Sequence, residues 1–143
     1  MRILAVDPGE KRLGIALSDP TGSIANPLTV IRHVSRAVDA AVIAQLASEH
    51  EAGKIVIGQA LDIEGRPSFE GRRAGRLANV LRTQTDLPVE LWDESGSTQA
   101  ARAARMAMGV KRSKRRGHLD DLAATYILQS YLDAHNPPSY PGE

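Results

Sequence analysis

Apolar residues form three short runs at the start of the chain, and these runs predict three strands. They cover residues 2–7, 13–18 and about 24–31. Only the five-residue turn Pro8–Arg12 separates the first two, so we expect them to pair as an antiparallel hairpin. Asn26-Pro27 lies inside the third run, and because proline has no N–H to donate to a sheet, this strand is expected at an edge.

After these runs the hydrophobic period lengthens to that of a helix. Ser35 is a typical capping residue, and the apolar spacing that follows predicts a helix running to about Glu51 and ended by Gly53. The residues expected on its buried face are Val38, Val42 and Leu46. A second helical pattern covers about 69–83, with an apolar face (Ala74, Leu77, Ala78, Leu81) and arginines on another face.

The remaining pattern alternates strands and helices. We expect a strand over 54–58, a loop over 59–68, a strand over 88–92, a helix over about 99–108, a final helix over about 119–134 and a loose tail over 136–143. Because the strand at 54–58 follows a helix, it is expected to run parallel to the first strand. The order predicts an α/β fold, in which a five-stranded mixed sheet with its first three strands antiparallel carries helices on both faces. Residues 1–135 are expected to form one domain.

Acidic residues stand where two of the expected strands end. Asp7 follows the first strand and Glu94 follows the strand at 88–92, and in such sheets reactive groups collect at the carboxyl ends of parallel strands. Asp120 opens the final helix. Helical spacing from Asp120 leads to the residues expected to pack on the sheet, namely Ala123, Ala124, Ile127 and Tyr131.

Three carboxylates brought together would repel one another, and a hard divalent cation removes that penalty. Oxygen ligands without cysteine or paired histidine favour Mg²⁺ or Mn²⁺ over zinc. Two such ions about 3.5 to 4 Å apart are the usual arrangement for in-line displacement at phosphate. In such a pair, the attacking water is prepared at one ion and the departing 3′ oxygen is stabilised at the other.

Each acid also fits a structural role, so the pattern leaves two interpretations open. Asp7 is an ordinary turn residue, and Asp93-Glu94 is an ordinary polar step into a helix cap. Asp120 and Asp121 are both favoured in the first turn of a helix by its dipole. Spacing does not choose between Asp120 and Asp121, because the residues below either one are apolar.

Composition narrows the class of protein. The chain has 143 residues, of which 42% are hydrophobic and 24% charged, as expected for one globular domain. It contains no apolar run approaching the roughly 18 residues that span a bilayer and no signal-peptide pattern at its start, so we expect a cytoplasmic protein with no membrane partner. The absence of cysteine excludes disulfides, thiolate metal sites and a cysteine nucleophile.

Positive charge is concentrated in one short segment. The formal net charge is only +1, and five basic residues within 111–116 leave a total of −4 for the rest of the chain. These residues are Lys111, Arg112, Lys114, Arg115 and Arg116. The segment is either a solvated loop or a contact with a polyanion, and in the second case binding should weaken steeply as salt rises.

Four stretches of the chain resemble the YqgF family. They are "DPGEKRLGIA" (7–16), "IVIGQALDIEG" (55–65), "WDESGST" (92–98) and "LDDLAATYILQSYL" (119–132). This family has a ribonuclease H-like fold, is related to RuvC-type Holliday junction resolvases and is also described as nucleases of pre-16S rRNA. The resemblance covers the whole chain apart from the expected tail.

The resemblance implies roles for particular residues. The catalytic, metal-binding acids fall on Asp7, Glu94 and Asp120, which chooses Asp120 over Asp121 by resemblance alone. The resemblance also places a basic pair on Lys11 and Arg12 in the hairpin turn, as candidates for substrate binding. To these we add Arg72, Arg73, Thr98 and the five basic residues of 111–116. Two departures stand out. Ser95 replaces an arginine that usually follows the Asp-Glu pair, and Gly58-Gln59-Ala60-Leu61 replaces Gly-Leu-Pro-Leu.

The implied function is a nuclease that uses Mg²⁺ or Mn²⁺, expected as two ions in one site, to mature the 5′ end of pre-16S rRNA. Two alternatives stay open: a dimeric Holliday junction resolvase acting on DNA, and a non-catalytic nucleic-acid-binding factor in ribosome assembly, which Ser95 makes conceivable. We therefore expect a nucleic-acid partner, ribosome-associated proteins as further partners, and a monomer or homodimer. A sugar-kinase-like ATPase is disfavoured, because 143 residues hardly hold a second phosphate loop and an adenosine site.

Overall fold

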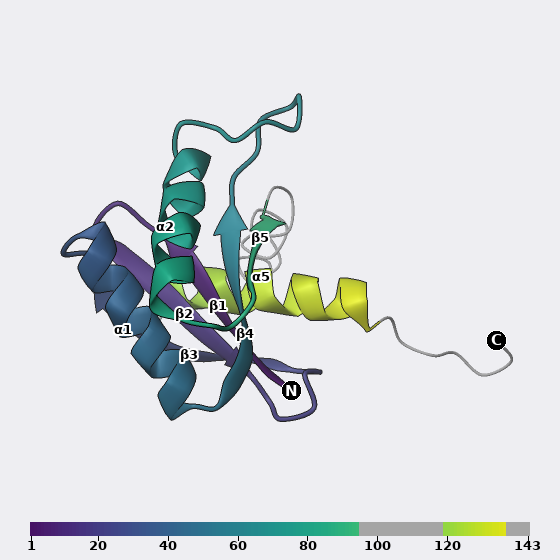
Figure 1. Ribbon diagram of the computed structural model, residues 1–143. Coiled ribbons are helices and arrows are strands. Elements are labelled where there is room, and N and C mark those ends of the chain that lie inside the picture. The colour runs from purple at the N-terminus through teal and green to yellow at the C-terminus, as the bar shows by residue number, and fades with distance from the viewer. Residues whose placement is uncertain (95–118, 137–143) are drawn as a thin grey trace, which may run out of the picture.

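The structure is a computed structural model and describes residues 1–94 and 119–136. The elements within them are β1 (Arg2–Pro8), β2 (Arg12–Ser18), β3 (Ala25–Arg32), α1 (Arg36–Glu49), β4 (Ala52–Gln59), α2 (Gly71–Gln84), β5 (Val89–Asp93) and α5 (Leu119–His135). The strands form one sheet in the order β3-β2-β1-β4-β5 (Figure 1). β1, β2 and β3 are antiparallel neighbours, whereas β4 runs parallel to both β1 and β5. The predicted five-stranded mixed sheet is confirmed.

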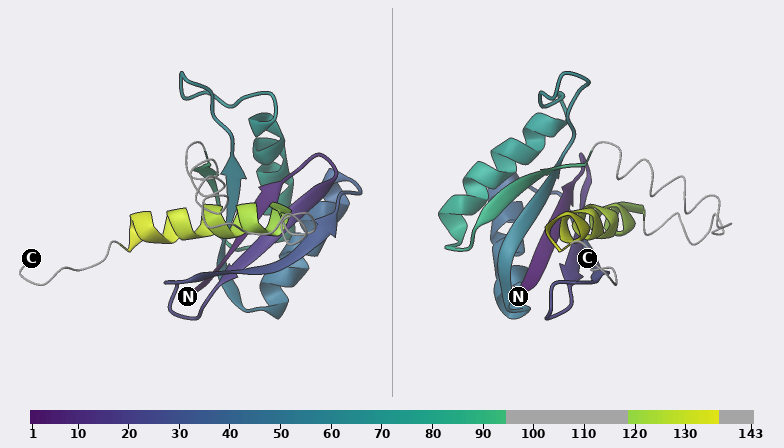
Figure 2. Two further views of the ribbon diagram at one scale, coloured as in Figure 1. Left: turned by 180° about the vertical axis from the view of Figure 1, so that it is seen from behind. Right: turned by 90° about the vertical axis from the view of Figure 1, so that its right-hand side faces the viewer.

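Helices cover both faces of this sheet, as predicted. Figure 2 shows α1 and α2 on one side and α5 on the other. The apolar side chains accordingly form two clusters. The larger one joins α1 and α2 to the sheet through residues such as Leu4, Val6 and Ile57. The smaller one joins α5 to the opposite face through residues such as Ala5 and Val56. Successive residues of a strand point to opposite faces, so β1 contributes to both clusters.

β3 is an edge strand, as the Asn26-Pro27 pair predicts. Ile15 of β2 lies opposite Thr29, whereas the next residue, Ala16, lies opposite Pro27, so the register shifts at this point. A proline at a register irregularity on an edge strand leaves no ladder hydrogen bond unmade in the interior of the sheet.

The first helix differs from the prediction in both its buried face and its end. The fully buried residues of α1 are Asp39, Ala40, Ile43 and Ala47, whereas of the three predicted residues Leu46 packs against the core only in part and Val42 is half-buried. Val38 is 44% exposed. The valine spacing missed this face because Asp39, Ile43 and Ala47 repeat the same spacing one residue further along, with an aspartate in the first of these positions.

The end of α1 is set by Glu51 rather than by Gly53. Glu51 has a φ of 57°, in the left-handed region that usually takes glycine. Its N–H donates to the carbonyl of Ser48, and the N–H of His50 donates to that of Leu46. Gly53 is already part of β4.

The second helix has the predicted apolar face, since Ala74, Leu77, Ala78 and Leu81 are all buried. It begins two residues later than predicted. Phe69 precedes the helix and is 81% exposed, so this aromatic residue contributes nothing to the core.

α5 is held on the sheet by a polar contact as well as by apolar packing. Lys54 Nζ of β4 donates to the hydroxyl of Tyr131 at 2.8 Å and lies 3.7 Å from Glu90 of β5. The hydrogen bond to Tyr131 raises the pKa of Lys54. Burial, followed by the nearby Glu90 carboxylate, raises the pKa of Tyr131. Trp92 packs edge-on against the Tyr131 ring.

Two predicted segments, the helix at 99–108 and the tail beyond residue 136, lie outside the described residues. Within 1–94 and 119–136, none of the helices is both long enough and apolar enough to cross a membrane.

Candidate functional site

Asp7 and Glu94 come from two strands that end at the same edge of the sheet. Ile3 and Ala5 of β1 belong to the cluster under α5, whereas Leu4 and Val6 belong to the opposite cluster. By this alternation Asp7, still within β1, points to the α5 face. Its backbone is fixed there by pairing with Gly14 of β2.

Gly58 of β4 creates the space beside Glu94. A Cβ added to Gly58 would lie 2.8 Å from Oε2 of Glu94 and 2.6 Å from Cδ1 of Ile127. Because Ile127 belongs to α5, this contact places the Glu94 carboxylate on the α5 face as well. The N–H of Glu94 donates to the carbonyl of Gln59 at 3.1 Å, which fixes the chain immediately after β5.

The strand register sets Asp7 and Glu94 on either side of Gly58. Val6 of β1 pairs with Ile57 of β4, so the next residue, Asp7, lies level with Gly58. On its other side, Gly58 pairs with Trp92 of β5. Asp7 and Glu94 are both half-buried, and Oε2 of Glu94 is itself buried. The sheet therefore gathers two of the three predicted acids on one face, separated by a residue with no side chain.

Asp120 lies in the first turn of α5, the helix that packs on this same face. Its side chain is outside what the structure describes, and so is that of Asp121. Among the side chains that are described, no three His, Cys, Asp or Glu residues are grouped as a metal site. The two gathered carboxylates still suit a hard cation, because they provide only oxygen donors in a half-buried setting.

The hairpin between β1 and β2 carries the predicted basic pair. Lys11 and Arg12 are exposed at its tip. The turn is tight, because the N–H of Gly9 donates to the carbonyl of Arg12 at 2.9 Å. A Cβ on Gly9 would overlap that carbonyl oxygen, so glycine is required there.

The other predicted basic residues separate into two groups. Arg72 and Arg73 lie in the first turn of α2, where Arg72 is exposed and Arg73 is half-buried. The second group lies outside the described residues, as does the substituted position Ser95. This group contains Thr98, Lys111, Arg112, Lys114, Arg115 and Arg116.

Gln59, one of the two departures from the family pattern, has a structural role. Its amide Nε2 donates to the carbonyl of Gly71 at 3.1 Å, so it ties the end of β4 to the start of α2. Gly71 itself lies against the carbonyl of Ala60, where a Cβ would overlap the oxygen. The altered loop thus still joins the strand and the helix closely.

A pair that the sequence analysis missed lies on the other face of the sheet. Nδ1 of His33 lies 2.5 Å from Oδ2 of Asp39, and the N–H of Val34 donates to Oδ1 at 3.0 Å. Asp39 is 3% exposed. The available signal was an aspartate one turn after the Ser35 cap, within a run of alanine and valine, where a buried acid needs a partner.

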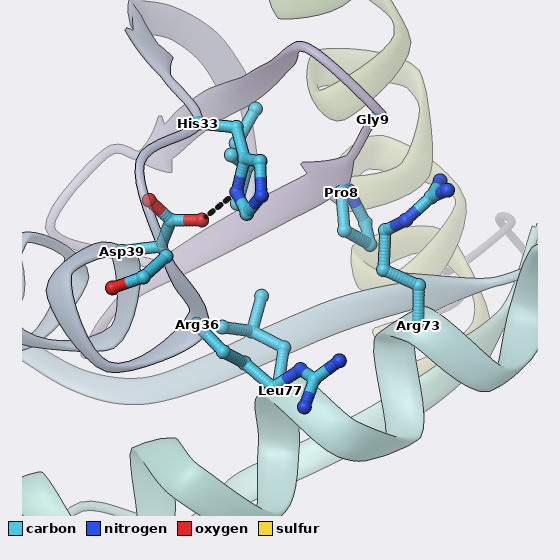
Figure 3. A pocket seen from close by; sticks show the side chains of 9 residues that line it. Pro8, Gly9, His33, Arg36, Asp39, Arg73 and Leu77 are labelled. Atoms are coloured by element: carbon cyan, nitrogen blue, oxygen red, sulfur yellow. Dashed lines mark hydrogen bonds and ion pairs between the residues drawn. The ribbon is translucent and has the colours of Figure 1, made fainter.

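This pair lines a pocket of about 290 Å³ beside the β1–β2 hairpin (Figure 3). Its walls come from the hairpin, from the segment between β3 and α1, and from both α1 and α2. The lining residues are Pro8, Gly9, Leu13, His33, Ser35, Arg36, Asp39, Arg73 and Leu77.

Comparison with known proteins gives a consistent picture. A family profile described as "RuvX: Holliday junction resolvase" matches residues 1–134. A protein of Myxococcus xanthus named "Putative pre-16S rRNA nuclease" is 39% identical over 138 residues, which are 96% of this chain and 91% of that protein. A protein of the same name from Syntrophus aciditrophicus is 41% identical over 143 residues, covering 100% of this chain and 95% of that one.

Solved structures support the fold at lower sequence identity. Thermus thermophilus RuvC in complex with a Holliday junction substrate superposes with a TM-score of 0.58 at 15% identity, covering 96% of each chain. The fowlpox virus resolvase, solved with Holliday junction DNA, gives a TM-score of 0.57 at 14% identity, covering 95% of this chain and 99% of that one. These similarities confirm the prediction that this chain has a ribonuclease H-like fold, as these resolvases do.

Proposed function

We propose, from the premise that this chain belongs to the RuvX (YqgF) family, that it is a divalent-metal-dependent nuclease that matures the 5′ end of pre-16S rRNA. Family membership supports a nuclease acting on nucleic acid. The observation that carries the proposal is the placement of Asp7 and Glu94 on one face of the sheet, on either side of Gly58. The choice of pre-16S rRNA as the substrate comes from the names of the relatives. The expected location is the cytoplasm, where ribosomes assemble.

The residues that would hold the metal are Asp7, Glu94 and Asp120. Their oxygen-only donor set suits Mg²⁺ or Mn²⁺, as one ion or a pair. Bound there, the metal would neutralise charge at the phosphate and lower the pKa of a water molecule. The protein's own contribution is to fix the acids, through the β1–β2 pairing at Asp7 and the backbone hydrogen bond of Glu94 to Gln59.

The reaction is a hydrolysis. A water oxygen forms a bond to phosphorus, the bond from phosphorus to the 3′ oxygen breaks, and the 3′ oxygen takes up a proton. The products carry a 5′-phosphate and a 3′-hydroxyl. Half-buried acids at a sheet edge leave one side open for the strand to approach.

Basic residues around this edge would position the strand through its phosphates. Lys11 and Arg12 at the hairpin tip and Arg72 at the start of α2 are exposed. We include Thr98 and the basic segment 111–116 in the same role. Such contacts hold the backbone without reading bases, and each one makes binding more sensitive to salt.

The proposal is tested by incubating the purified protein with a 5′-extended small-subunit rRNA precursor and with a four-way DNA junction, each in Mg²⁺, in Mn²⁺ and in chelator. Cleavage of the precursor in either metal and none in chelator is expected. Asp7→Asn keeps the shape of the side chain and should fold normally while losing cleavage. Undiminished cleavage by a clean Asp7→Asn preparation would contradict the catalytic assignment.

A junction resolvase is the second candidate, favoured by the description of the matching family profile. Paired cuts in a four-way junction need two sites in one dimer. Cleavage of the junction but not of the precursor, together with a dimer in light scattering, would choose this function. Binding of either nucleic acid without cleavage in any metal would instead make the chain a binding factor of ribosome assembly.

A further inference from the structure

The pocket beside the β1–β2 hairpin is on the opposite face of the sheet from the acids. Pro8 and Leu13 line it, and Leu13 belongs to the cluster under α1 and α2. Asp7 and Pro8 are consecutive residues of β1, so their side chains point to opposite faces. The pocket and the acidic site therefore share one strand end without sharing a side chain.

Two arginines with no acidic partner among the described residues line this pocket. Arg36 is the first residue of α1 and Arg73 lies in the first turn of α2, and both line the cavity (Figure 3). Within the part of the chain that the structure describes, neither forms an ion pair. Guanidinium groups present a planar set of donors that matches phosphate oxygens, and two in one pocket leave an excess of positive charge.

His33 adds a third polar group whose orientation is fixed. Nδ1 of His33 faces Oδ2 of Asp39, and because an ionised carboxylate only accepts hydrogen bonds, this contact fixes which edge of the ring faces the pocket. The second ring nitrogen, Nε2, is turned toward the side of the pocket where Pro8 lies (Figure 3), and it can donate to a phosphate oxygen when both ring nitrogens carry a proton. Asp39 is almost fully buried and is held by the Val34 N–H, so it serves to orient the ring.

The size of the pocket matches a phosphate with part of its sugar. Its volume of about 290 Å³ is close to the lower end of the range for small-ligand sites, roughly 300 to 1,000 Å³. Pro8, Leu13 and Leu77 add apolar side chains to the lining of the pocket. A bare metal ion does not fit this composition, because two arginines would repel it.

We propose that the pocket formed by His33, Arg36 and Arg73 is a second phosphate-binding site, which anchors a backbone phosphate of the nucleic acid on the face of the sheet opposite the cleavage acids. The exposed Lys11 and Arg12 lie on the hairpin between the two faces and give the strand a basic path from one to the other. That the bound phosphate belongs to a nucleic acid rests on the proposed function. That the pocket binds phosphate at all rests on the pocket alone.

The first test uses small probes and is independent of nuclease activity. Inorganic phosphate and adenosine 5′-monophosphate are titrated into the full chain while the ring signals of His33 are followed by NMR. A saturable shift is expected in the wild type and its loss in Arg36→Gln/Arg73→Gln. The absence of any His33 shift in the wild type with both probes would overturn the phosphate site, whatever the protein cleaves.

The second test asks whether the phosphate belongs to a nucleic acid. Anisotropy of labelled precursor RNA is measured over a salt series in chelator, so that no cleavage occurs. Removing one phosphate contact should lower the slope of log affinity against log salt by about 0.7 to 0.9. Arg36→Gln/Arg73→Gln should show this drop. Arg76→Gln removes one positive charge from an exposed site on α2 outside the pocket, which matches the single variant Arg73→Gln, and it should leave the slope unchanged.

These outcomes separate the pocket from the proposed function. If the pocket variant cleaves normally and its affinity depends on salt as in the wild type, the pocket does not anchor the nucleic acid. A shift of the His33 signals with the mononucleotide would then make the pocket a small-molecule site. Thermal unfolding of each variant shows whether it is folded. The single variant Arg73→Gln, which leaves α1 untouched, replaces the double variant if that one unfolds, and it should lose the same slope increment.

Discussion

The carboxylate of Glu94 lies directly over Gly58, close enough that a single added methyl group would come within 2.8 Å of its Oε2. Gly58 is buried and belongs to β4, the strand between those that carry Asp7 and Glu94. A side chain here would fill the space between the two acids. The glycine therefore serves the site through the room that it leaves.

Gly58→Ala should reduce cleavage more than it reduces stability. The new methyl group meets both Glu94 and Ile127, and overpacking of this kind costs about 1 to 3 kcal/mol of unfolding free energy. Displacement of Glu94 should lower kcat at least tenfold, measured at a temperature where the variant is folded. Gly53→Ala is the matched control on the same strand, because its methyl group meets only the flexible side chain of Met1. Equal activity in the two variants would argue against a role for Glu94.

Mg²⁺ or Mn²⁺ should raise the Tm of the wild-type protein. A ligand that binds only the folded state stabilises it by about 2.7 kcal/mol when present at one hundred times its Kd. Asp7→Asn and Glu94→Gln remove a donor each and should shrink this shift, as measured by calorimetry. Asp86→Asn changes an exposed acid in the loop before β5 and should keep the full shift. A full shift in all three variants would place the metal elsewhere.

The order of the elements was predictable because hydrophobic period and turn residues are local signals. The proline pair placed β3 at the edge, and the helix before 54–58 implied a parallel strand. The buried face of α1 was not predictable in the same way. Two series with the same spacing, Val38-Val42-Leu46 and Asp39-Ile43-Ala47, lie one residue apart on α1, so spacing alone could not tell which of them the fold buries.

The site shows the same limit. Asp7 and Glu94 could be anticipated, since strand ends at one edge gather side chains. The His33–Asp39 pair could not, because it joins the end of one strand to the first turns of a helix through a contact set by the fold. Spacing also could not choose between Asp120 and Asp121, and their side chains lie outside the described residues, so the roles assigned to them stay proposals.

Stability should fall in alkaline solution as the contact between Lys54 and Tyr131 titrates. Both pKa values are raised in the folded protein, so their contribution is complete below the unfolded values of 10.5 and 10.0 and is lost as pH rises through the folded ones. Thermal unfolding from about pH 8 to about pH 11 should show this decline. Tyr131→Phe should be less stable at the lower pH and decline less steeply. An identical decline in the variant would mean that other groups cause it.

The stability lost on shortening side chains of α1 to alanine should depend on the face that the structure buries, not on the valine spacing. Ile43 is fully buried between α1 and the sheet, so Ile43→Ala should cost about 2 to 5 kcal/mol of unfolding free energy. Val38 is 44% exposed, and Val38→Ala should change stability by no more than about 0.5 kcal/mol. Chemical denaturation of the two variants measures both values. Because the substitutions lie five residues apart in one helix and both introduce alanine, helix propensity largely cancels between them and the difference reports burial. A larger loss at Val38 than at Ile43 would show that α1 is rotated about its axis relative to the face described here.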